Sequence, residues 1–513
     1  MAVPAVMPAA PTPALVLESS GPVLLFDIHR TPYTPTGRPI ALDGTSRQLG
    51  WTGTEGSGPT LVWTLPDPDR RPSLHRVAGT PLIAQVTDDG EAEVARRGLG
   101  GQWEPHLAVL TDEGRPAGSV WVRDGGSCVM LPFDPNEAMA NLWTEAYLQA
   151  LTPHVERVLA LGRSAYYHLR PVVPRHLQIA FRRRLAHQQA RTAFPRWPVE
   201  PALHDLYDLL FGLLAGALGQ PVPSLAPWPS GRRWAFVLTH DVETAAGLDG
   251  IEPLRAVERR HGLVSAWNFV PERYELPASL RAGLLAEGCE IGVHGLTHDG
   301  HDVESPAALA ARLPAIRGYA RMWGATGFRA PAMQRSWAAM DLLDFDHDAS
   351  FPDTDPFQPC RGGCCTWWPI MHGDMVELPL TLPQDHTLFV ILEATGPGAW
   401  IEKTELLRTR GGLAQVLVHP DYLDETGSLT AYEELLATFV DDPAAWFALP
   451  AEVSSWWRAR ARSSVVVGPS GWEAVGPAAD RAEVRLLPER RTTMPLRHAE
   501  ERTSPRTSPD RER

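Results

Sequence analysis

Two histidines four residues apart are the first feature of this sequence that could carry out chemistry. His294 and His298 stand in the segment EIGVHGLTH. If this segment forms a helical turn, both imidazoles lie on one face and can hold a single metal ion. Ordinary core or surface histidines show the same spacing, so the pair needs support from other parts of the chain.

Two carboxylates in the segment THDVE could supply that support. Asp241 and Glu243 point to the same side if a strand continues through them, because side chains alternate along a strand. One carboxylate could complete a His–His–carboxylate site with a position left open for water, and the other could act as a base. The competing interpretation is an acidic pair that caps the following helix.

An arginine and a third histidine extend the set. Arg329, in GFRAP, stays ionised and would pair with and orient a carboxylate base. His419, in LVHP, has the side chain best suited to donating a proton near neutral pH. For these two residues the alternatives are a structural salt bridge and a buried core histidine.

The elements that must position these residues follow a repeating pattern. Predicted strands cover residues 235–239, 264–270, 290–293, 326–329, 388–392 and 414–418, and predicted helices cover residues 252–261, 278–287, 307–322, 338–343, 402–408 and 431–440. Repeated β-then-α units predict a parallel sheet or barrel with helices outside. Because the carboxyl ends of barrel strands converge on one mouth, Asp241, His294, Arg329 and His419 are expected to meet in one pocket.

Taken in order, THDVE, EIGVHGLTH, GFRAP, DHDASF and LVHP resemble the five motifs of the NodB-type polysaccharide deacetylases, carbohydrate esterase family four. The resemblance spans residues 235–422. It implies an α/β fold, a distorted (β/α) barrel with fewer than eight units. It also implies a hydrolase that removes an N-acetyl group from a sugar.

The resemblance also implies a role for each motif residue. Asp241 matches the family's catalytic base, Arg329 the arginine that orients the base, and His419 the catalytic acid. His294 and His298 match the metal-binding histidines. The expected cofactor is a divalent metal, zinc by ligand type.

The first motif departs from the family pattern. In the family a metal-binding aspartate directly follows the base, whereas this chain has Val242 there. We assign the third metal ligand to Glu243, as in related D-x-E variants; the alternative makes Asp241 the ligand and Glu243 the base. In the histidine motif Gly295 replaces the usual Ser or Thr, which removes a possible hydrogen bond within the loop.

Three further residues are expected around the substrate. Asp348 would match the fourth motif, and would position the acid histidine or line the pocket. Pro331, in GFRAP, is expected to line the same pocket. Trp367 is expected to offer a flat face on which a sugar ring could stack.

The expected substrate is an N-acetylated carbohydrate, as a polysaccharide, an oligosaccharide or a precursor. Two other functions stay open. The barrel could hydrolyse a C–N bond outside sugars, as ureide amidohydrolases of the same superfamily do. Alternatively, the altered first motif could mark a carbohydrate-binding module that has lost catalysis.

The remainder of the chain divides by composition. We expect a flexible leader (1–14), a β-rich or α+β domain with a helical segment (15–220), a Pro-rich linker (221–233), the barrel (234–460) and an extension (461–513). The first domain has strand-like runs at 23–28, 60–64 and 119–122, and a basic helix is predicted at 176–191. The extension is predicted to form one hairpin (464–487) and to be disordered from 488.

Bulk properties exclude some classes of partner. The net charge of −14 argues against a general nucleic-acid binder. No apolar run approaches the ~18 residues of a membrane span. The leader has no basic n-region, and five cysteines give no disulfide framework, so a cytoplasmic location is expected.

Overall fold

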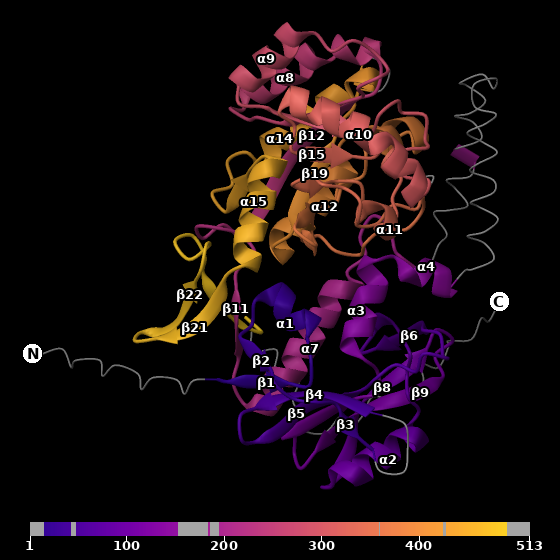
Figure 1. The fold of residues 1–513 in the computed structure, drawn as a ribbon, viewed down its shortest axis with the longest axis vertical. Helices are drawn as coiled ribbons and strands as arrows, with labels where there is room; N and C mark the ends of the chain where they lie inside the picture. Colours follow the sequence, from indigo (N-terminus) through magenta and orange to yellow (C-terminus); the bar gives the residue numbers. More distant parts are fainter. Residues whose placement is uncertain are drawn as a thin grey trace, which may run out of the picture.

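The computed structural model describes residues 15–42, 48–151, 183–184, 194–358, 360–423 and 427–489. The described elements fall into two halves, each built on its own sheet (Figure 1). The predicted leader, most of the predicted basic helix at 176–191 and the tail from 490 onward lie outside the described residues.

A ten-stranded mixed sheet forms the lower half in Figure 1, in the order β2-β1-β4-β5-β10-β9-β8-β6-β7, with β3 paired to β4. Helices α1, α3 and α7 pack on one face of it, and α2 packs on the other. The strands are β1 (Leu17–Ser19), β2 (Tyr33–Pro35), β3 (Ile40–Ala41), β4 (Gln48–Thr54), β5 (Gly58–Thr64), β6 (Ser73–Val77), β7 (Thr80–Ala84), β8 (Trp103–Thr111), β9 (Pro116–Arg123) and β10 (Cys128–Leu131). The helices are α1 (Leu24–His29), α2 (Asp89–Leu99), α3 (Pro135–Trp143), α4 (Ala146–Leu151) and α7 (Ala202–Leu218).

One predicted strand of this half is wrong. Residues 23–28 were expected to be extended, but residues 24–29 form helix α1. The run VLLFDI has no alternation of apolar and polar residues, and Leu25, Phe26 and His29 are buried together at helical spacing. The strands expected at 60–64 and 119–122 are confirmed as parts of β5 and β9.

A second sheet forms the upper half, in the order β17-β18-β16-β15-β14-β13-β12-β19, with β20 beside β12. All its printed pairs are parallel except β17–β18. The strands are β12 (Trp234–Val242), β13 (Ala266–Phe269), β14 (Glu290–His294), β15 (Gly327–Arg329), β16 (His347–Asp348), β17 (Ile370–His372), β18 (Met375–Glu377), β19 (Leu413–Leu417) and β20 (Ala445–Phe447). The α-helices are α8 (Ile251–Arg260), α9 (Ala278–Ala286), α10 (Pro306–Trp323), α11 (Trp337–Met340), α12 (Gly398–Arg410), α14 (Ser428–Phe439) and α15 (Pro450–Ala461), and the shorter helical segments are η2 (Ala245–Leu248), η3 (Pro331–Met333), η4 (His386–Ile391) and η5 (Pro420–Tyr422).

Strand β12 pairs with β13, β19 and β20 and is buried along its whole length. Its even-numbered side chains face the outer helices; His240, for example, contacts Glu258 of α8 and the ring of Tyr432 of α14. The odd-numbered side chains point to the inside of the curled sheet, where Ala235 and Val237 belong to an apolar cluster. Because side chains alternate, this register also sends Asp241 inward at the carboxyl end of the strand.

The sheet curls into a half-barrel, and a complete (β/α) barrel is not formed. Its edge strands β17 and β19 do not pair with each other within the described part of the chain. The segment 378–382, which follows β18, runs beside β19 instead, with Leu382 N donating to Gln415 O at 3.0 Å and Thr381 Oγ1 donating to Leu413 O at 2.7 Å. The expected distorted barrel is therefore present only in its curled, incomplete form.

The predicted strand at 388–392 is also wrong, because residues 386–391 form the π-helical segment η4. The sequence HTLFVI is rich in β-branched and aromatic residues, which favours a strand by propensity. The side chain of Asp385 accepts a hydrogen bond from the backbone N of His386 at 2.7 Å and caps this helical segment. Local capping therefore prevails over β propensity here.

The predicted linker and the predicted tail hairpin meet each other. Within the linker, β11 (Val222–Leu225) forms a strand that pairs antiparallel with β23 (Val484–Leu487). Pro223 is tolerated because this sheet has only two strands. The hairpin is shorter than expected, since it joins β21 (Ser464–Gly468) to β22 (Gly471–Val475) and leaves β23 to pair with β11.

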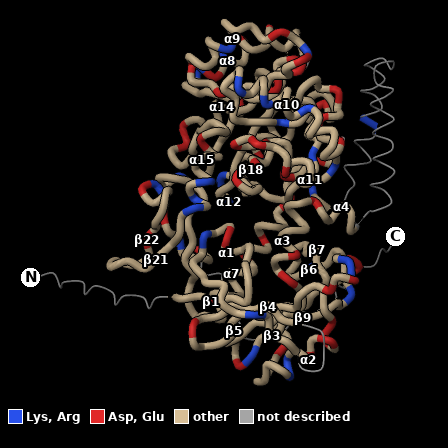
Figure 2. Tube along the Cα trace, viewed as in Figure 1, with Lys and Arg blue, Asp and Glu red and all other residues tan. Residues whose placement is uncertain are grey.

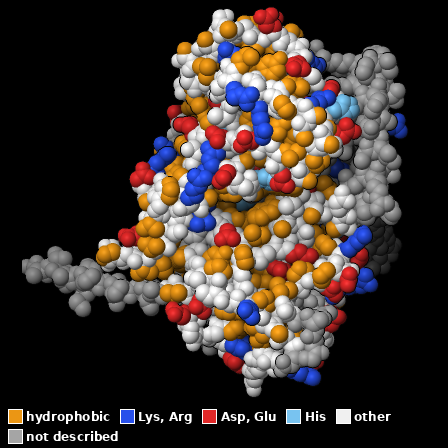
Figure 3. Space-filling view, in the orientation of Figure 1, with side chains coloured by type: hydrophobic (Ala, Val, Ile, Leu, Met, Phe, Trp, Pro, Cys, Tyr) orange, Lys and Arg blue, Asp and Glu red, His pale blue; other side chains and the backbone are white. Residues whose placement is uncertain are grey.

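The surface carries charges of both signs. Acidic and basic residues are interspersed over both halves of the described chain (Figure 2). In the space-filling view, hydrophobic side chains gather along the junction between the halves (Figure 3). There Trp143 and Trp368 each pack against the cores of both halves. Among the described residues, no helix is long and apolar enough to cross a membrane.

A buried ion pair also joins the two halves. Arg335, which lies between β15 and α11, donates from Nε and Nη2 to the two carboxylate oxygens of Glu145, at 2.7 and 2.5 Å. Only 2% of the Arg335 side chain and 11% of the Glu145 side chain are exposed. The bidentate geometry fixes the loop after β15 against the first half.

Glu145→Ala is expected to lower the free energy of unfolding by about 3–5 kcal/mol, because it leaves a buried guanidinium without its counter-charge. Denaturant titration followed by tryptophan fluorescence would measure the change. The matched control is Glu93→Ala, which breaks the exposed pair with Arg97, where 77% of the arginine and 49% of the glutamate side chain are exposed. Equal effects of the two substitutions would contradict the prediction.

Candidate metal and catalytic site

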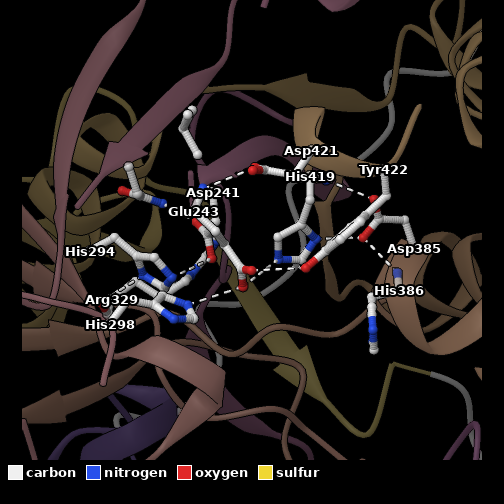
Figure 4. A network of polar contacts seen from close by, with 12 residues as sticks. Asp241, Glu243, His294, His298, Arg329, Asp385, His386, His419, Asp421 and Tyr422 are labelled. Atoms are coloured by element: carbon white, nitrogen blue, oxygen red, sulfur yellow. Dashed lines mark hydrogen bonds and ion pairs between the residues drawn. The ribbon is translucent and has the colours of Figure 1, made fainter. Parts of the chain in front are cut away.

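Three side chains from two strand ends form a cluster that could hold a metal ion. Glu243 follows β12, His294 ends β14, and His298 lies in the loop after β14. One oxygen of Glu243 and one nitrogen from each histidine all lie within 4.8 Å of one another. The rings point toward the glutamate from one side (Figure 4).

The histidines are brought together by a loop and not by a helical turn. Gly295 (φ 63°) and His298 (φ 57°) both have left-handed backbone conformations, and the two imidazole centroids are 5.1 Å apart. A helical turn through residues 294–298, which the sequence suggested, is therefore not needed to bring the two rings together. A tight loop achieves the same convergence of the two rings.

The donor atoms suit a divalent metal. His294 Nδ1 lies 3.0 Å from the backbone oxygen of Arg329, to which it can donate, so its Nε2 is left with a free lone pair. That Nε2 is buried and has no hydrogen-bond partner among the described residues. Burial also lowers the pKa of His294 to about 4, so its ring is neutral at pH 7. A neutral, buried and unpartnered imidazole nitrogen beside a carboxylate is the chemistry of a metal ligand.

Asp241 lies beside this cluster but is held by other partners. Its Oδ1 accepts hydrogen bonds from Asn268 Nδ2 at 2.8 Å and from Arg329 Nη1 at 3.1 Å. Its Oδ2 lies 3.7 Å from His294 Nε2. Burial alone would raise the pKa of Asp241, but the charge of Arg329, with smaller contributions from His294 and His419, lowers it to about 2. The carboxylate is therefore ionised and fixed in orientation.

His419 faces the same cluster from the end of β19. Its Nδ1 lies 2.6 Å from Asp385 Oδ1, and its backbone N donates to Asp385 Oδ2 at 2.7 Å. Its Nε2 points back to Glu243 Oε1 at 3.9 Å. Burial would lower the pKa of His419, but the charges of Asp385 and Glu243 outweigh it and raise this pKa to about 10. The imidazole is thus protonated at neutral pH, as a proton donor must be.

A buried aspartate holds the loop after β14, which contains Gly295. The buried carboxylate of Asp302 accepts a hydrogen bond from Leu296 N at 3.2 Å and is itself paired with Arg312 Nη1 at 2.7 Å. A Cβ at Gly295 would lie 2.2 Å from Asp302 Oδ2 and 2.6 Å from Pro331 Cδ. Pro331 therefore packs against this loop, and Asp302 takes the place that a side chain at 295 would need.

Gly295→Ser is expected to weaken zinc binding by about 10–100-fold, the range of a change just outside the metal ligands. The added atoms would displace Asp302 or Pro331, and the residue would also have to keep a positive φ. Zinc affinity measured by competition with a chromophoric chelator is the test. Gly318→Ala, in the following helix where an added Cβ meets nothing within 4 Å, serves as control. Wild-type affinity in Gly295→Ser would refute the role given to this glycine.

Asp348 was expected to position the acid histidine or to line the pocket, and the structure gives His419 a different partner, Asp385. Asp348 Oδ1 accepts from Ser350 Oγ at 2.6 Å, and Ser350 Oγ accepts from the backbone N of Ala330 at 2.8 Å. Burial raises the pKa of Asp348, and burial together with the Asp348 charge raises that of Glu377 well above its usual value. Asp348 thus supports the strand that carries the arginine.

The expectation that Trp367 lines the pocket is also corrected. Its indole is 1% exposed and stacks on His204 of α7, with ring centroids 3.9 Å apart and planes 7° apart. The guanidinium carbon of Arg410 lies 5.5 Å from its ring centroid. Trp367 therefore belongs to the junction between the halves, where it cannot present a face to a sugar.

Four residues around the cluster were not foreseen, and each left only a weak signal. Asn268 is a polar residue inside the buried strand AWNF, which is unusual for a packed core. Asp385 precedes a run whose composition resembles a strand, so its capping role was hidden. Asp421 and Tyr422 come two and three residues after His419 and lie on η5 beside Glu243 (Figure 4).

Comparisons with known proteins find likeness in structure only. No family model and no curated protein matches the sequence. A putative polysaccharide deacetylase from Mycobacterium smegmatis is 19% identical, and the likeness covers 46% of this chain and 94% of that one, with a TM-score of 0.39. A probable polysaccharide deacetylase from Pseudomonas aeruginosa PAO1 is 15% identical over 47% and 96% of the chains, with a TM-score of 0.38. PuuE allantoinase is 15% identical over 45% and 92%, with a TM-score of 0.36.

Proposed function

We propose that the half formed by residues 234–460 is a metal-dependent hydrolase that removes an N-acetyl group from a sugar. The observation that carries this proposal is the convergence of Glu243, His294 and His298 beside Asp241, which is bonded to Arg329, and His419, which is bonded to Asp385. A carboxylate base and an imidazolium acid on either side of a metal-ligand set are what amide hydrolysis requires.

Glu243, His294 and His298 would hold the ion, and zinc fits a ligand set of two imidazoles and one carboxylate. A bound divalent cation supplies a lowered pKa for water and charge stabilisation for the oxyanion that develops on the amide. This assignment makes Asp241 the base, because its Oδ1 is already engaged by Arg329 and Asn268 and the carboxylate does not complete the ligand cluster.

Asp241 would take the proton from the attacking water, and Arg329 would keep its carboxylate ionised and oriented. His419 Nε2 would then give a proton to the leaving nitrogen, which is necessary because an amide anion is a very poor leaving group. Asp385, bonded to Nδ1 of the same ring, would hold the imidazole in position and stabilise its charge, as a carboxylate does behind a catalytic histidine.

The proposed substrate class, an N-acetylated carbohydrate, rests on the order of the five motifs that resemble the polysaccharide deacetylases. The purified full-length chain, loaded with Zn²⁺, should release acetate from oligomers of N-acetylglucosamine. The same preparation should be tested against allantoin and simple acetamides. If the protein hydrolyses only allantoin or the acetamides, the proposed substrate class changes from an N-acetylated sugar to another amide. If the wild-type chain binds no metal, a carbohydrate-binding module without catalysis is favoured.

A further inference from the structure

The turn that follows His419 also forms hydrogen bonds with Glu243, the proposed third metal ligand. Segment η5 carries Asp421 and Tyr422, two and three residues after His419. The hydroxyl of Tyr422 donates to Glu243 Oε2 at 2.8 Å. One short stretch of chain thus presents both a proposed proton donor and a direct contact to a proposed ligand (Figure 4).

Asp421 fixes the backbone of the same ligand. Its Oδ2 accepts from Glu243 N at 3.0 Å, and its Oδ1 accepts from Thr244 N at 3.0 Å and from Thr244 Oγ1 at 2.5 Å. These bonds lie where β12 has just ended and the chain would otherwise be free to change direction. The Asp421 carboxylate therefore fixes the backbone position of Glu243, and with it the position of the Glu243 Cα–Cβ bond.

Two glycines allow the turn to approach this closely. A Cβ at Gly247 would lie 2.4 Å from Asp421 Oδ2, and a Cβ at Gly250 would lie 2.4 Å from Pro420 O. Both glycines belong to the segment that follows Glu243 in the chain. Larger residues at either position would push η5 away from the end of β12.

The two carboxylate oxygens of Glu243 have different surroundings as a result. Oε2 is occupied by Tyr422, whereas Oε1 faces His298 Nε2 at 3.1 Å and His419 Nε2 at 3.9 Å. A carboxylate whose second oxygen is held by a hydroxyl is directed to bind an ion through the first oxygen only. Positions on a bound ion would then stay open for water and substrate.

We propose that Asp421 and Tyr422 are positioning residues that hold Glu243 ready as a metal ligand through Oε1 alone. This inference rests on the proposed metal site. A glutamate has more rotamer freedom to lose than the aspartate that the family pattern places one residue earlier. The hydrogen bonds from Tyr422 and to Asp421 restrict the Glu243 rotamers before an ion binds, which favours tight metal binding.

Tyr422→Phe in the full-length chain tests the proposal. The apo variant is expected to bind Zn²⁺ about 10–100-fold more weakly than the wild type in competition with a chromophoric chelator. With Co²⁺ in place of zinc, its visible absorption spectrum should also change, because both oxygens of Glu243 become available. Thr244→Val, which removes one donor to Asp421 with little change of shape, should weaken zinc binding in the same direction.

The matched control is Tyr432→Phe. Its buried hydroxyl donates to Glu258 Oε1 at 2.8 Å, on the opposite side of β12 from the metal ligands. Both Tyr→Phe variants lose one hydrogen bond to a glutamate, and circular dichroism and thermal melting of the apo proteins would show whether each folds. Only Tyr422→Phe should lose metal affinity and alter the cobalt spectrum.

The outcomes separate this inference from the proposed function. If the wild type binds no zinc, the metal site itself is refuted. If the wild type binds zinc, and the zinc affinities of folded Tyr422→Phe and Thr244→Val are within threefold of the wild-type affinity, Asp421 and Tyr422 do not position Glu243. Equal losses in Tyr422→Phe and Tyr432→Phe would also overturn it, because the effect would then be a general one of stability.

Discussion

Asp241→Asn is expected to lower turnover by about 10²–10⁴-fold, the usual contribution of a general base, with the bound zinc retained. The amide side chain keeps the size of the aspartate and can still accept from Arg329, but it cannot take a proton from water. Acetate release at saturating sugar and metal content by elemental analysis are the two measurements. Thermal melting is also needed, because the substitution removes the counter-charge of an arginine that is 1% exposed.

Comparison with Glu243→Gln shows which of the two carboxylates binds the metal and which acts as the base. Glu243→Gln should lose zinc, whereas Asp241→Asn should keep it. The reverse result would make Asp241 the third ligand and Glu243 the base, the alternative that the sequence left open. Near-normal turnover of metal-loaded Asp241→Asn would reject the base assignment. Asp249→Asn, an exposed residue eight positions along the chain, is the control for the substitution itself.

His294→Ala is expected to weaken zinc binding by more than about 100-fold, beyond the effect of removing a residue outside the ligand set. The variant loses one of three proposed protein ligands, and it leaves a cavity lined by the unpaired carbonyl of Arg329. Added zinc should raise the melting temperature of the wild type, because an ion that binds only the folded chain stabilises it. A chelator should reverse that shift, and the shift should be absent in His294→Ala.

His301→Ala is the matched control for this experiment. His301 lies in the same loop, but its ring faces Glu304 at 2.9 Å and lies outside the ligand cluster. It should bind zinc as the wild type does. Loss of zinc in both variants would mean that the loop as a whole is fragile, and wild-type affinity in His294→Ala would remove this histidine from the metal site.

The sequence predicted the second half of the molecule well where its signals are local. The apolar runs that became β12, β14, β15 and β19 are bounded by turns and followed by amphipathic helices, so their type and order are confirmed. The strand ends gave the positions of Asp241, His294, Arg329 and His419. Their meeting follows from a general property of parallel sheets and needed no knowledge of side-chain packing.

The sequence was misleading at three segments. Residues 24–29 form a helix whose buried side chains pack against α3, and residues 386–391 are helical behind the cap of the adjacent Asp385. Trp367 looked suitable for a sugar, but the partner that buries it is His204, about 160 positions earlier in the chain. No pattern in the sequence around Trp367 records that partner.

What the sequence by itself determined is the set of chemical groups: two imidazoles, two carboxylates, a guanidinium and a further histidine, each at or near the end of a strand. What only the tertiary structure decided is which partners bind each of the two carboxylates. Asp241 is engaged by Arg329 and Asn268, and Glu243 by His298 and Tyr422. The physical reason is that each partner comes from a different strand or turn, so the division depends on distances that arise only when the sheet curls.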